Sequence, residues 1–342
     1  MSDRCFILHA VNVHGGGGLT LLKSLLNVLP SRSKLILDER MPLSNDELSQ
    51  FFVYRIKPTL WGRFKAELLL KRLALDSDTV LCFGNLPPMF RLRAKVLLFI
   101  QNRYLVEPSL LSSTAFKLRL RLTIEHFWLS FFQRNINEAV VQTPSMQALS
   151  CNYISAPVVI APFVAKSNLD VDLTEASKCK EYNFIYVASG EPHKNHQRLL
   201  DAWVELARQG LYPSLCLTLN DKQFPRLVEC FAIKKKQYNL RIDNRGLVVG
   251  NETLELYKHA EALIFPSTLE SFGLPLIEAK NAGLKIVASE LDYVRDILAP
   301  DESFDPQSAI SIARAVKRLM KLESEKLDLL SAKEFITLLM GK

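Results

Sequence analysis

Two glutamates, Glu270 and Glu278, flank a segment that reads Ser-Phe-Gly-Leu-Pro-Leu-Ile. An apolar run at residues 262–265 precedes them and is typical of a buried strand. Gly273 permits a tight turn after that strand, and Pro275 suits the first turn of a helix. We therefore expect Glu270 on a loop at the carboxyl end of a strand and Glu278 inside the following helix.

The start of this predicted helix could bind an anion. The backbone N–H groups of Phe272, Gly273 and Leu274 have no partner inside the helix and would point out of its N-terminus. Together with the helix dipole, such groups form a ready site for a phosphate. Solvated or helix-capping carboxylates are the alternative interpretation of the two glutamates.

A second loop with charged residues follows the strand-like residues 183–188 and reads Ser-Gly-Glu-Pro-His-Lys-Asn. Its lysine, Lys194, stands just before a helical pattern at residues 196–208. An ammonium at a helix N-terminus is suited to neutralising the charge that develops on a departing phosphate. Without a partner motif, this loop would be interpreted as a turn with an exposed lysine.

Four consecutive glycines, residues 15–18, lie between a strand-like run at residues 5–13 and a helical pattern at residues 19–28. In a strand–turn–helix unit, backbone N–H groups can approach a phosphate closely. The run does not match the Gly-x-Gly-x-x-Gly dinucleotide pattern. A flexible turn is the alternative, and we favour a loop that faces an interdomain cleft.

Strand-like and helical segments alternate along both halves of the chain, which predicts two parallel sheets covered by helices on both faces. A polar stretch without periodicity, residues 164–182, separates the halves. We therefore predict domains at residues 1–164 and 165–342, with a helix over residues 308–339. The predicted strands are 34–37, 79–83, 96–100, 139–142 and 158–160 in the first half, and 183–188, 214–219, 247–249, 262–265 and 285–288 in the second.

The segment from Glu270 to Glu278, with Phe-Gly-Leu-Pro between the glutamates and a strand before them, resembles the Glu-x7-Glu motif of retaining glycosyltransferases of family 4, also called group 1. The resemblance is dense over residues 184–298 and thin over the first domain. It implies the GT-B fold, in which two Rossmann-like domains flank a cleft and the last helix crosses back onto the first domain. It also implies transfer of a sugar from a nucleotide diphosphate sugar, as in bacterial O-antigen and other surface polysaccharides.

The resemblance also implies roles for individual residues. Glu270 and Lys194 would be catalytic, with Glu270 at the donor sugar and Lys194 at the diphosphate. Glu278 would accept hydrogen bonds from the ribose hydroxyls. The remaining donor contacts would come from Gly16, Gly17, Ser189, Gly190, His193, Ser271, Phe272, Gly273 and Leu274.

The chain departs from the family pattern at two positions. Ser189 stands where many members carry an arginine, and Gln101 where many carry a histidine near the donor sugar. We expect Gln101, Asn102 and Arg103 on the acceptor side. Because glutamine cannot act as a base near neutral pH, the leaving phosphate oxygen would accept the acceptor proton. The two predicted site loops, residues 189–195 and 266–274, carry no Asp-x-Asp metal motif, so we expect transfer without a metal or cofactor.

Three other functions are alternatives to sugar transfer from a nucleotide sugar. Glycosidase carboxyls stand about 5–10 Å apart across one bond, whereas eight helical positions rise about 12 Å; the two glutamates therefore fit opposite ends of a nucleotide sugar better. A nucleotide-sugar epimerase or a phosphorylase-like GT-B enzyme is a second alternative. Nucleic-acid binding is suggested only by the net charge of +7, and no recognition motif accompanies it.

The basic excess lies in the first half: residues 1–165 carry 19 Lys+Arg and 11 Asp+Glu, against 24 and 25 in the rest. Two apolar segments with interleaved basic residues, 64–73 and 116–132, suggest contact with a membrane headgroup region. Core helices with snorkelling basic side chains are the alternative, equally compatible for residues 116–132, and residues 116–122 also alternate like a strand. We expect a lipid-linked oligosaccharide acceptor and an anionic membrane surface as partners.

Other features favour a cytoplasmic protein that is peripheral on the inner face of the membrane. The six cysteines show no Cys-x-x-Cys spacing, which favours reduced thiols over disulfides or a zinc site. The N-terminal residues lead directly into a strand-like run without a signal-like segment. The longest stretch without charge, residues 139–165, contains prolines and serines and does not suit a membrane span.

Overall fold

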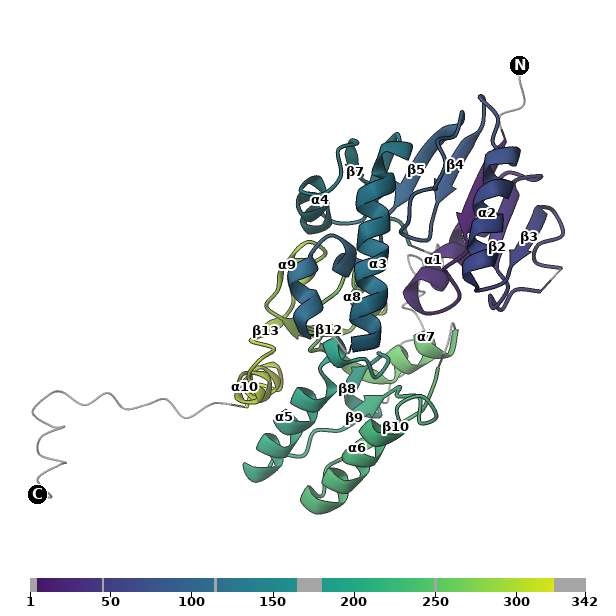
Figure 1. The fold of residues 1–342 in the computed structure, drawn as a ribbon. Helices are drawn as coiled ribbons and strands as arrows, with labels where there is room; N and C mark the ends of the chain where they lie inside the picture. Colours follow the sequence, from purple (N-terminus) through teal and green to yellow (C-terminus); the bar gives the residue numbers. More distant parts are fainter. Residues whose placement is uncertain (1–4, 45, 114–115, 165–179, 249–250, 323–342) are drawn as a thin grey trace, which may run out of the picture.

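A computed structural model describes residues 5–44, 46–113, 116–164, 180–248 and 251–322. The chain forms two α/β domains, one after the other in sequence (Figure 1). Each domain is built on a sheet in which every pair of neighbouring strands is parallel. The predicted fold class, two doubly wound Rossmann-like domains, is confirmed.

The first sheet has the strand order β3-β2-β1-β4-β5-β6-β7. All of its strands except β3 were predicted, and β3 carries only partly buried or exposed side chains because it is an edge strand. The strands are β1 (Phe6–Ala10), β2 (Lys34–Asp38), β3 (Phe52–Ile56), β4 (Thr79–Cys82), β5 (Lys95–Phe99), β6 (Glu138–Val141) and β7 (Val158–Ile160).

Helices cover both faces of the first sheet. Helix α1 (Gly16–Leu26) packs Leu21 and Leu22 into a core cluster on one face. Helices α2 (Leu60–Leu73), α3 (Phe116–Phe132) and α4 (Pro144–Cys151) contribute Leu70, Leu129 and Met146 to the cluster on the other face. Residues 116–132 are therefore helical throughout, and the strand alternative for residues 116–122 was wrong.

The second sheet repeats the order of the first six strands, as β10-β9-β8-β11-β12-β13. The strands are β8 (Tyr182–Tyr186), β9 (Leu215–Leu217), β10 (Ile242–Asn244), β11 (Ala260–Phe265), β12 (Lys285–Ser289) and β13 (Glu302–Phe304). The helices are α5 (His196–Arg208), α6 (Pro225–Tyr238), α7 (Asn251–Lys258), α8 (Leu274–Asn281), α9 (Asp292–Arg295) and α10 (Ala309–Leu319). One buried cluster, which includes Trp203 and Tyr257, forms the core of this domain.

Three predictions about individual segments either differ from the structure or reach residues that it does not describe. The strand predicted at residues 247–249 is wrong, because Leu247 is exposed and the third strand of this sheet is β10, five residues earlier. Of the helix predicted at residues 308–339, α10 packs against α5 within the second domain, and residues 323–342 lie outside the described ranges. The predicted domain boundary at residue 164 adjoins residues 165–179, which also lie outside them.

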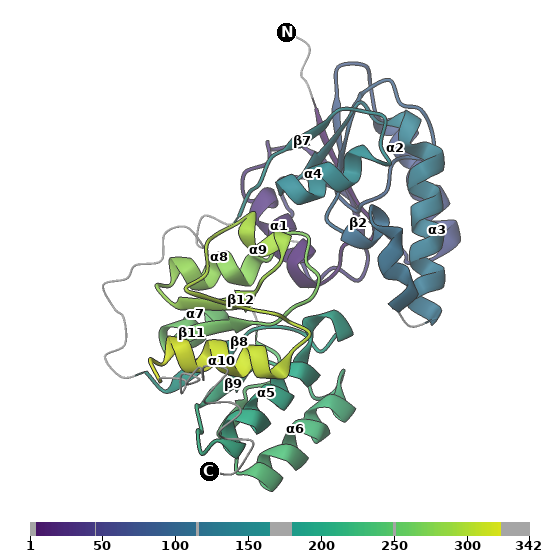
Figure 2. The same cartoon turned by 90° about the vertical axis from the view of Figure 1, so that its left-hand side faces the viewer.

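The two strand orders determine where a ligand can bind. In such sheets the site lies beyond the carboxyl ends of the strands, where the order reverses. That point lies between β1 and β4 in the first domain and between β8 and β11 in the second. Figure 2 shows α1, which follows β1, beside α8 and α9 of the second domain. Among the described residues, no helix is long and apolar enough to cross a bilayer.

Candidate active site

The loops after β8 and β11 are held together by hydrogen bonds. Their strands are neighbours in the sheet, so the two loops emerge side by side. The backbone N–H of Thr268 donates to the carbonyl of His193 over 2.8 Å, and the hydroxyls of Thr268 and Ser267 donate to the same oxygen over 3.1 and 3.2 Å. These bonds fix the position of the lysine loop relative to the glutamate loop.

Lys194 and Glu270, the two predicted catalytic residues, are in direct contact. The Lys194 Nζ lies 2.6 Å from Glu270 Oε1, and the side chains are only 17% and 13% exposed. The buried Tyr186 donates its hydroxyl to the Lys194 carbonyl over 2.7 Å. Asn195 adopts a left-handed conformation (φ 60°) and donates to the Pro266 carbonyl over 3.1 Å, which ends the loop and begins α5. These hydrogen bonds of Tyr186 and Asn195 thus hold the backbone that carries Lys194 in position.

Glu278 lies in α8, as predicted, and its helix begins at the predicted turn. Gly273 has a φ of 72°, a region that favours glycine, and it is the N-cap of α8, where it makes no side-chain cap hydrogen bond. The buried Tyr257 hydroxyl lies 3.4 Å from Glu278 Oε2. Burial and the Glu278 carboxylate raise the Tyr257 pKa, so this hydroxyl stays a hydrogen-bond donor. The two glutamates therefore flank an open helix N-terminus, one before it and one beyond it.

Gly190 and Ser189 shape the start of the lysine loop. A Cβ atom on Gly190 would meet the ring of Phe224, with Cδ2 only 2.8 Å away, so a larger residue would displace that ring. The exposed Ser189 hydroxyl donates to the Glu191 carboxylate. Ser189 therefore supplies no positive charge at the position where an arginine would have stood, and Lys194 is the cation of this loop.

The glycine loop of the first domain faces this site across the domain boundary. A Cβ atom on Gly17 would lie 3.4 Å from Leu274 Cδ1, at the start of α8. Leu274 itself packs against the core cluster beneath α1. Gly16 has a φ of 63° and opens α1. The structure therefore brings Gly17, and with it the glycine loop, to the start of α8.

Tyr104 is a site residue that the sequence did not indicate. It belongs to a short 3₁₀ turn after β5, and its ring packs edge-on against His193, with centroids 6.3 Å apart. Burial and the negative charge of Glu270 raise the Tyr104 pKa. Burial and then the Lys194 charge lower the His193 pKa, which keeps that imidazole neutral. No motif identified Tyr104, because its position depends on how the domains meet.

Gln101 and Asn102 are fixed by the loop after β4. Both backbone N–H groups donate to the Asn85 side-chain oxygen, over 2.5 and 3.0 Å. The Gln101 amide donates to the Phe83 carbonyl over 3.1 Å, and its oxygen faces Gly18. Gln101 thus lies against the glycine loop, and its role toward an acceptor stays a prediction.

Arg103, expected on the acceptor side, joins the two domains. Its Nη1 and Nη2 lie 2.9 and 2.8 Å from the carboxylate of Asp292, at the start of α9, and its Nε donates to Glu107 over 2.7 Å. Burial opposes the charged guanidinium, yet the two carboxylates raise the pKa of Arg103. At the other end of α9, Asp296 accepts from the Ser145 backbone N–H over 2.9 Å, at the start of α4. Helix α9 is therefore a docking point for the first domain.

Replacing Arg103 by methionine should loosen the domain contact. We expect a larger radius of gyration in small-angle X-ray scattering, because the bidentate bridge is lost while apolar packing is retained. Burial opposes the Asp292 carboxylate, but Arg103 holds its pKa below the ordinary value. The bridge should therefore persist above about pH 4 and be lost as the pH falls further.

The control for this experiment is Arg318, whose Nε lies 2.6 Å from Glu302 within the second domain. Arg318→Met removes a comparable ion pair without touching the boundary between domains. An unchanged radius of gyration in Arg103→Met, equal to that of Arg318→Met, would contradict a docking role for α9.

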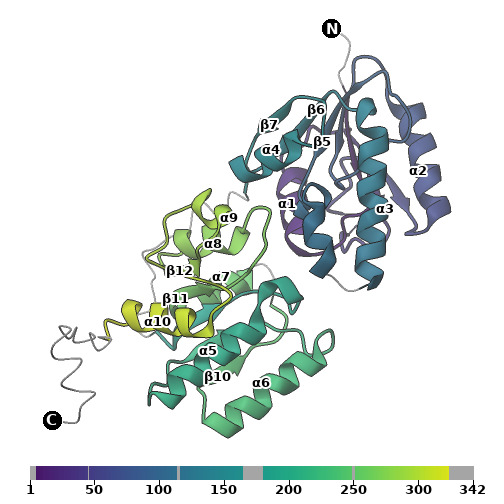
Figure 3. The same cartoon turned by 60° about the vertical axis from the view of Figure 1, so that its left-hand side comes forward.

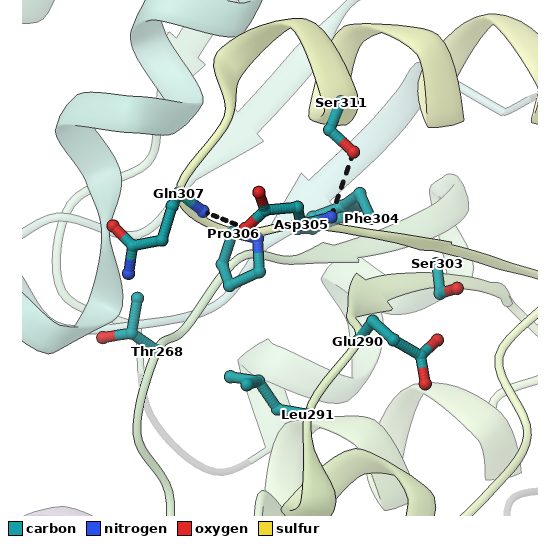
Figure 4. A pocket seen from close by; sticks show the side chains of 9 residues that line it. All are labelled: Thr268, Glu290, Leu291, Ser303, Phe304, Asp305, Pro306, Gln307 and Ser311. Atoms are coloured by element: carbon teal, nitrogen blue, oxygen red, sulfur yellow. Dashed lines mark hydrogen bonds between the residues drawn. The ribbon is translucent and has the colours of Figure 1, made fainter.

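A cavity of about 550 Å³ adjoins the glutamate loop (Figure 4). Thr268 belongs to both the loop and the cavity wall. Hydrogen bonds from Arg295 lower the pKa of Glu290, in the same wall, to about 2, so this carboxylate is ionised and already paired. The other lining residues are Leu291, Ser303, Phe304, Asp305, Pro306, Gln307 and Ser311. Within the described ranges, no group of three or more His, Cys, Asp or Glu side chains could hold a metal ion.

Comparison with known proteins links this geometry to a family. Residues 174–333, which include both loops and α8, match the family model described as glycosyl transferases group 1. The second half of the chain is similar to a glycosyltransferase domain. The match agrees with the resemblance seen around Glu270 and Glu278.

Two curated relatives are mannosyltransferases by name. The serotype-specific mannosyltransferase WbdA of Escherichia coli is 32% identical over 148 residues, which are 41% of this chain and 17% of WbdA. The O-antigen chain mannosyltransferase RfbU of Salmonella typhimurium is 30% identical over 141 residues, 39% of this chain and 38% of RfbU. The aligned part thus spans less than two fifths of either relative.

Solved structures extend the similarity of fold to both domains. The structure of Anabaena HepE in complex with UDP superimposes with a TM-score of 0.66 at 14% identity, covering 93% of this chain and 90% of HepE. Such low identity shows the fold alone. The two doubly wound domains therefore have the GT-B arrangement.

Proposed function

We propose that this protein is a retaining hexosyltransferase that moves a sugar from a nucleotide diphosphate sugar to a glycan acceptor in surface polysaccharide biosynthesis. The observation that carries the proposal is the contact between Lys194 and Glu270, 2.6 Å apart on adjacent loops beside the N-terminus of α8. A cation, a carboxylate and a helix N-terminus at one sheet edge suit a sugar joined to a diphosphate.

The proposed donor lies along the edge between the domains. The diphosphate meets the N–H groups at the start of α8 and the ammonium of Lys194. The ribose hydroxyls donate to Glu278, which the buried Tyr257 hydroxyl helps to orient. The sugar lies near Glu270, with the glycine loop covering the diphosphate from the first domain. In the absence of a donor, Glu270 neutralises Lys194, so a buried unpaired charge is avoided.

The proposed reaction breaks the bond between the anomeric carbon and the diphosphate oxygen. An acceptor hydroxyl oxygen bonds to the same face of that carbon, and its proton passes to the departing phosphate oxygen. Lys194 and the helix N-terminus stabilise the negative charge on the leaving group. No metal or cofactor takes part in this scheme, so turnover should continue in the presence of a chelator such as EDTA.

The acceptor is proposed to be a lipid-linked oligosaccharide, used by a protein that is peripheral on the cytoplasmic side of the membrane. The name of RfbU, an O-antigen chain mannosyltransferase, supports an O-antigen type of acceptor. The excess of basic residues in the first domain supports a position near an anionic surface.

A screen of nucleotide sugars by thermal shift, with mannosyl donors first, tests the proposal. We expect at least one nucleotide sugar to raise the melting temperature, because a ligand that binds only the folded state stabilises it. Release of the nucleoside diphosphate should then require an acceptor. Release without acceptor and with epimerised sugar would favour an epimerase, and no stabilisation by any donor would contradict a donor site.

A further inference from the structure

Helix α3 exposes a continuous apolar stripe to solvent. Phe116, Leu120, Ile124, Phe127 and Phe131 follow one another at intervals of three or four residues, so they lie within roughly 80° of the helix circumference. Each is more than half exposed, from 54% for Leu120 to 79% for Phe116. We call these five residues the α3 stripe. It runs for about 22 Å, which is long for an apolar patch on a soluble protein.

The opposite side of α3 already packs against the protein. Leu122 and Leu129 point into the core cluster of the first domain and are 3% and 1% exposed. The stripe is therefore additional to the surface that the fold requires, and no described residue covers it. A helix that is apolar on two opposite sides needs a second apolar environment.

Basic side chains flank the stripe. Lys117 and Arg121 lie along one border of the stripe and Arg119 along the other, at the helical angles that their positions give. All three are exposed, and Arg121 pairs with Glu125 over 2.8 Å. An apolar stripe bordered by cations is the pattern of helices that lie in the headgroup region of an anionic bilayer.

Helix α2 extends this surface. It covers the same face of the sheet as α3, and the Arg63 guanidinium of α2 stacks over the Trp128 ring of α3, 5.4 Å from its centroid. Figures 2 and 3 show the two helices along one outer side of the first domain. On α2, Trp61 and Leu68 are 64% and 45% exposed, and Lys65 stands over the Trp61 ring. Tryptophan beside lysine is well suited to a membrane interface.

We propose that the α3 stripe, together with the exposed side of α2, docks the protein onto an anionic phospholipid bilayer, with α3 lying in the plane of the headgroups. The basic border favours an anionic occupant over a second copy of the protein. A copy seated in parallel would bring Lys117, Arg119 and Arg121 toward their own counterparts, and an antiparallel copy would place them opposite residues 126–130, which carry no acidic side chain. An anionic surface instead complements them.

This docking would place the bilayer next to the candidate active site. The His126 ring of α3 is 2.8 Å from the carbonyl of Leu105, in the 3₁₀ turn that also carries Tyr104 and Arg103. Helix α3 therefore contacts the turn whose Tyr104 and Arg103 reach the second domain. The inference deepens the proposed function by specifying how a lipid-linked acceptor reaches the site.

Co-sedimentation with vesicles tests the proposal, without donor or acceptor. One vesicle population consists of phosphatidylcholine alone, and the other of phosphatidylcholine and phosphatidylglycerol in equal parts. We expect the protein to sediment with the second and to be released by added salt. Phe127→Ser with Phe131→Ser should weaken binding about tenfold or more, because two aromatic anchors are lost.

Ile233 and Ile310 provide the matched control, since they are 58% and 54% exposed on the second domain. Their double replacement by serine should leave vesicle binding unchanged. Because every substituted side chain is exposed, all variants should keep the melting temperature of the wild type.

Three results would overturn the proposal: no binding to either vesicle, equal binding to both, or a dimer in solution that Phe127→Ser and Phe131→Ser dissociate without any vesicle binding. The last result would make the stripe an interface between copies. Vesicle binding without turnover of any nucleotide sugar would support the docking surface and contradict the proposed function, so the two failures are distinguishable.

Discussion

Replacing Glu270 by glutamine is expected to lower kcat by about 10²–10³-fold, the loss typical of removing one preorganised electrostatic group from an active site. Glutamine keeps the size of the side chain but loses the charge that faces Lys194 and, in the proposed complex, the donor sugar. Affinity for the nucleoside diphosphate should stay the same or increase, because the diphosphate no longer competes with Glu270 for the ammonium.

The control for Glu270→Gln is Asp201→Asn. Asp201 accepts from Lys234 over 2.6 Å, the same distance as in the Lys194–Glu270 pair, but joins α5 and α6 away from the candidate site. Steady-state kinetics and calorimetric titration of the nucleoside diphosphate on both variants separate turnover from binding. Equal kcat in Glu270→Gln and wild type would remove Glu270 from the proposed mechanism.

Replacing Lys194 by methionine is expected to weaken both binding and turnover. A hydrogen bond to a charged group contributes about 1.5–3 kcal/mol, so the Kd of the nucleoside diphosphate should rise about 10–100-fold. The leaving group also loses a cation in the transition state, which should lower kcat by a further factor of about 10²–10³. Titration and kinetics on one preparation measure both effects.

Lys234→Met provides the comparison for this substitution, because it breaks the matched pair with Asp201. It should leave Kd and kcat at wild-type values. If Lys194→Met and Lys234→Met gave the same Kd and the same kcat, the assignment of Lys194 to the diphosphate would fail.

The second-domain part of the site was predictable because local sequence determines it. Gly273 and Pro275 fix the turn and the helix start, so Glu270 and Glu278 had to lie before and within α8. Lys194 precedes α5, whose predicted limits match the structure. The direct contact between Lys194 and Glu270 was not predictable from the sequence, because it depends on the hydrogen bonds that join the two loops.

The residues at the domain boundary could not be predicted. Tyr104 and Arg103 follow β5 in the first domain, whereas their partners His193 and Asp292 lie about 90 and 190 positions further along the chain. No local pattern records such a contact, since it arises only when the two carboxyl edges face each other. Arg103 was accordingly placed on the acceptor side, although its side chain is paired with Asp292.

Secondary structure was predicted wrongly where the hydrophobic pattern of a segment is not the one typical of its element. The edge strand β10 reads Ile-Asp-Asn and needs only one buried side chain, so it lacks the apolar run that predicts a strand. Residues 116–122 alternate apolar and basic side chains, which is also the strand pattern. In the structure that alternation belongs to α3, which buries Leu122 in the core and exposes Phe116 and Leu120 in the outer apolar stripe.

Calorimetric titration of UDP, GDP, ADP, CDP and dTDP into the wild type and into a Lys194→Met, Glu278→Ala double variant tests the central claim most directly. The account predicts that at least one nucleoside diphosphate binds the wild type, one molecule per chain, and that the double variant loses this binding while remaining folded. Equal binding to both proteins, or binding of none of the five to the wild type, would contradict a donor site built on the loops after β8 and β11.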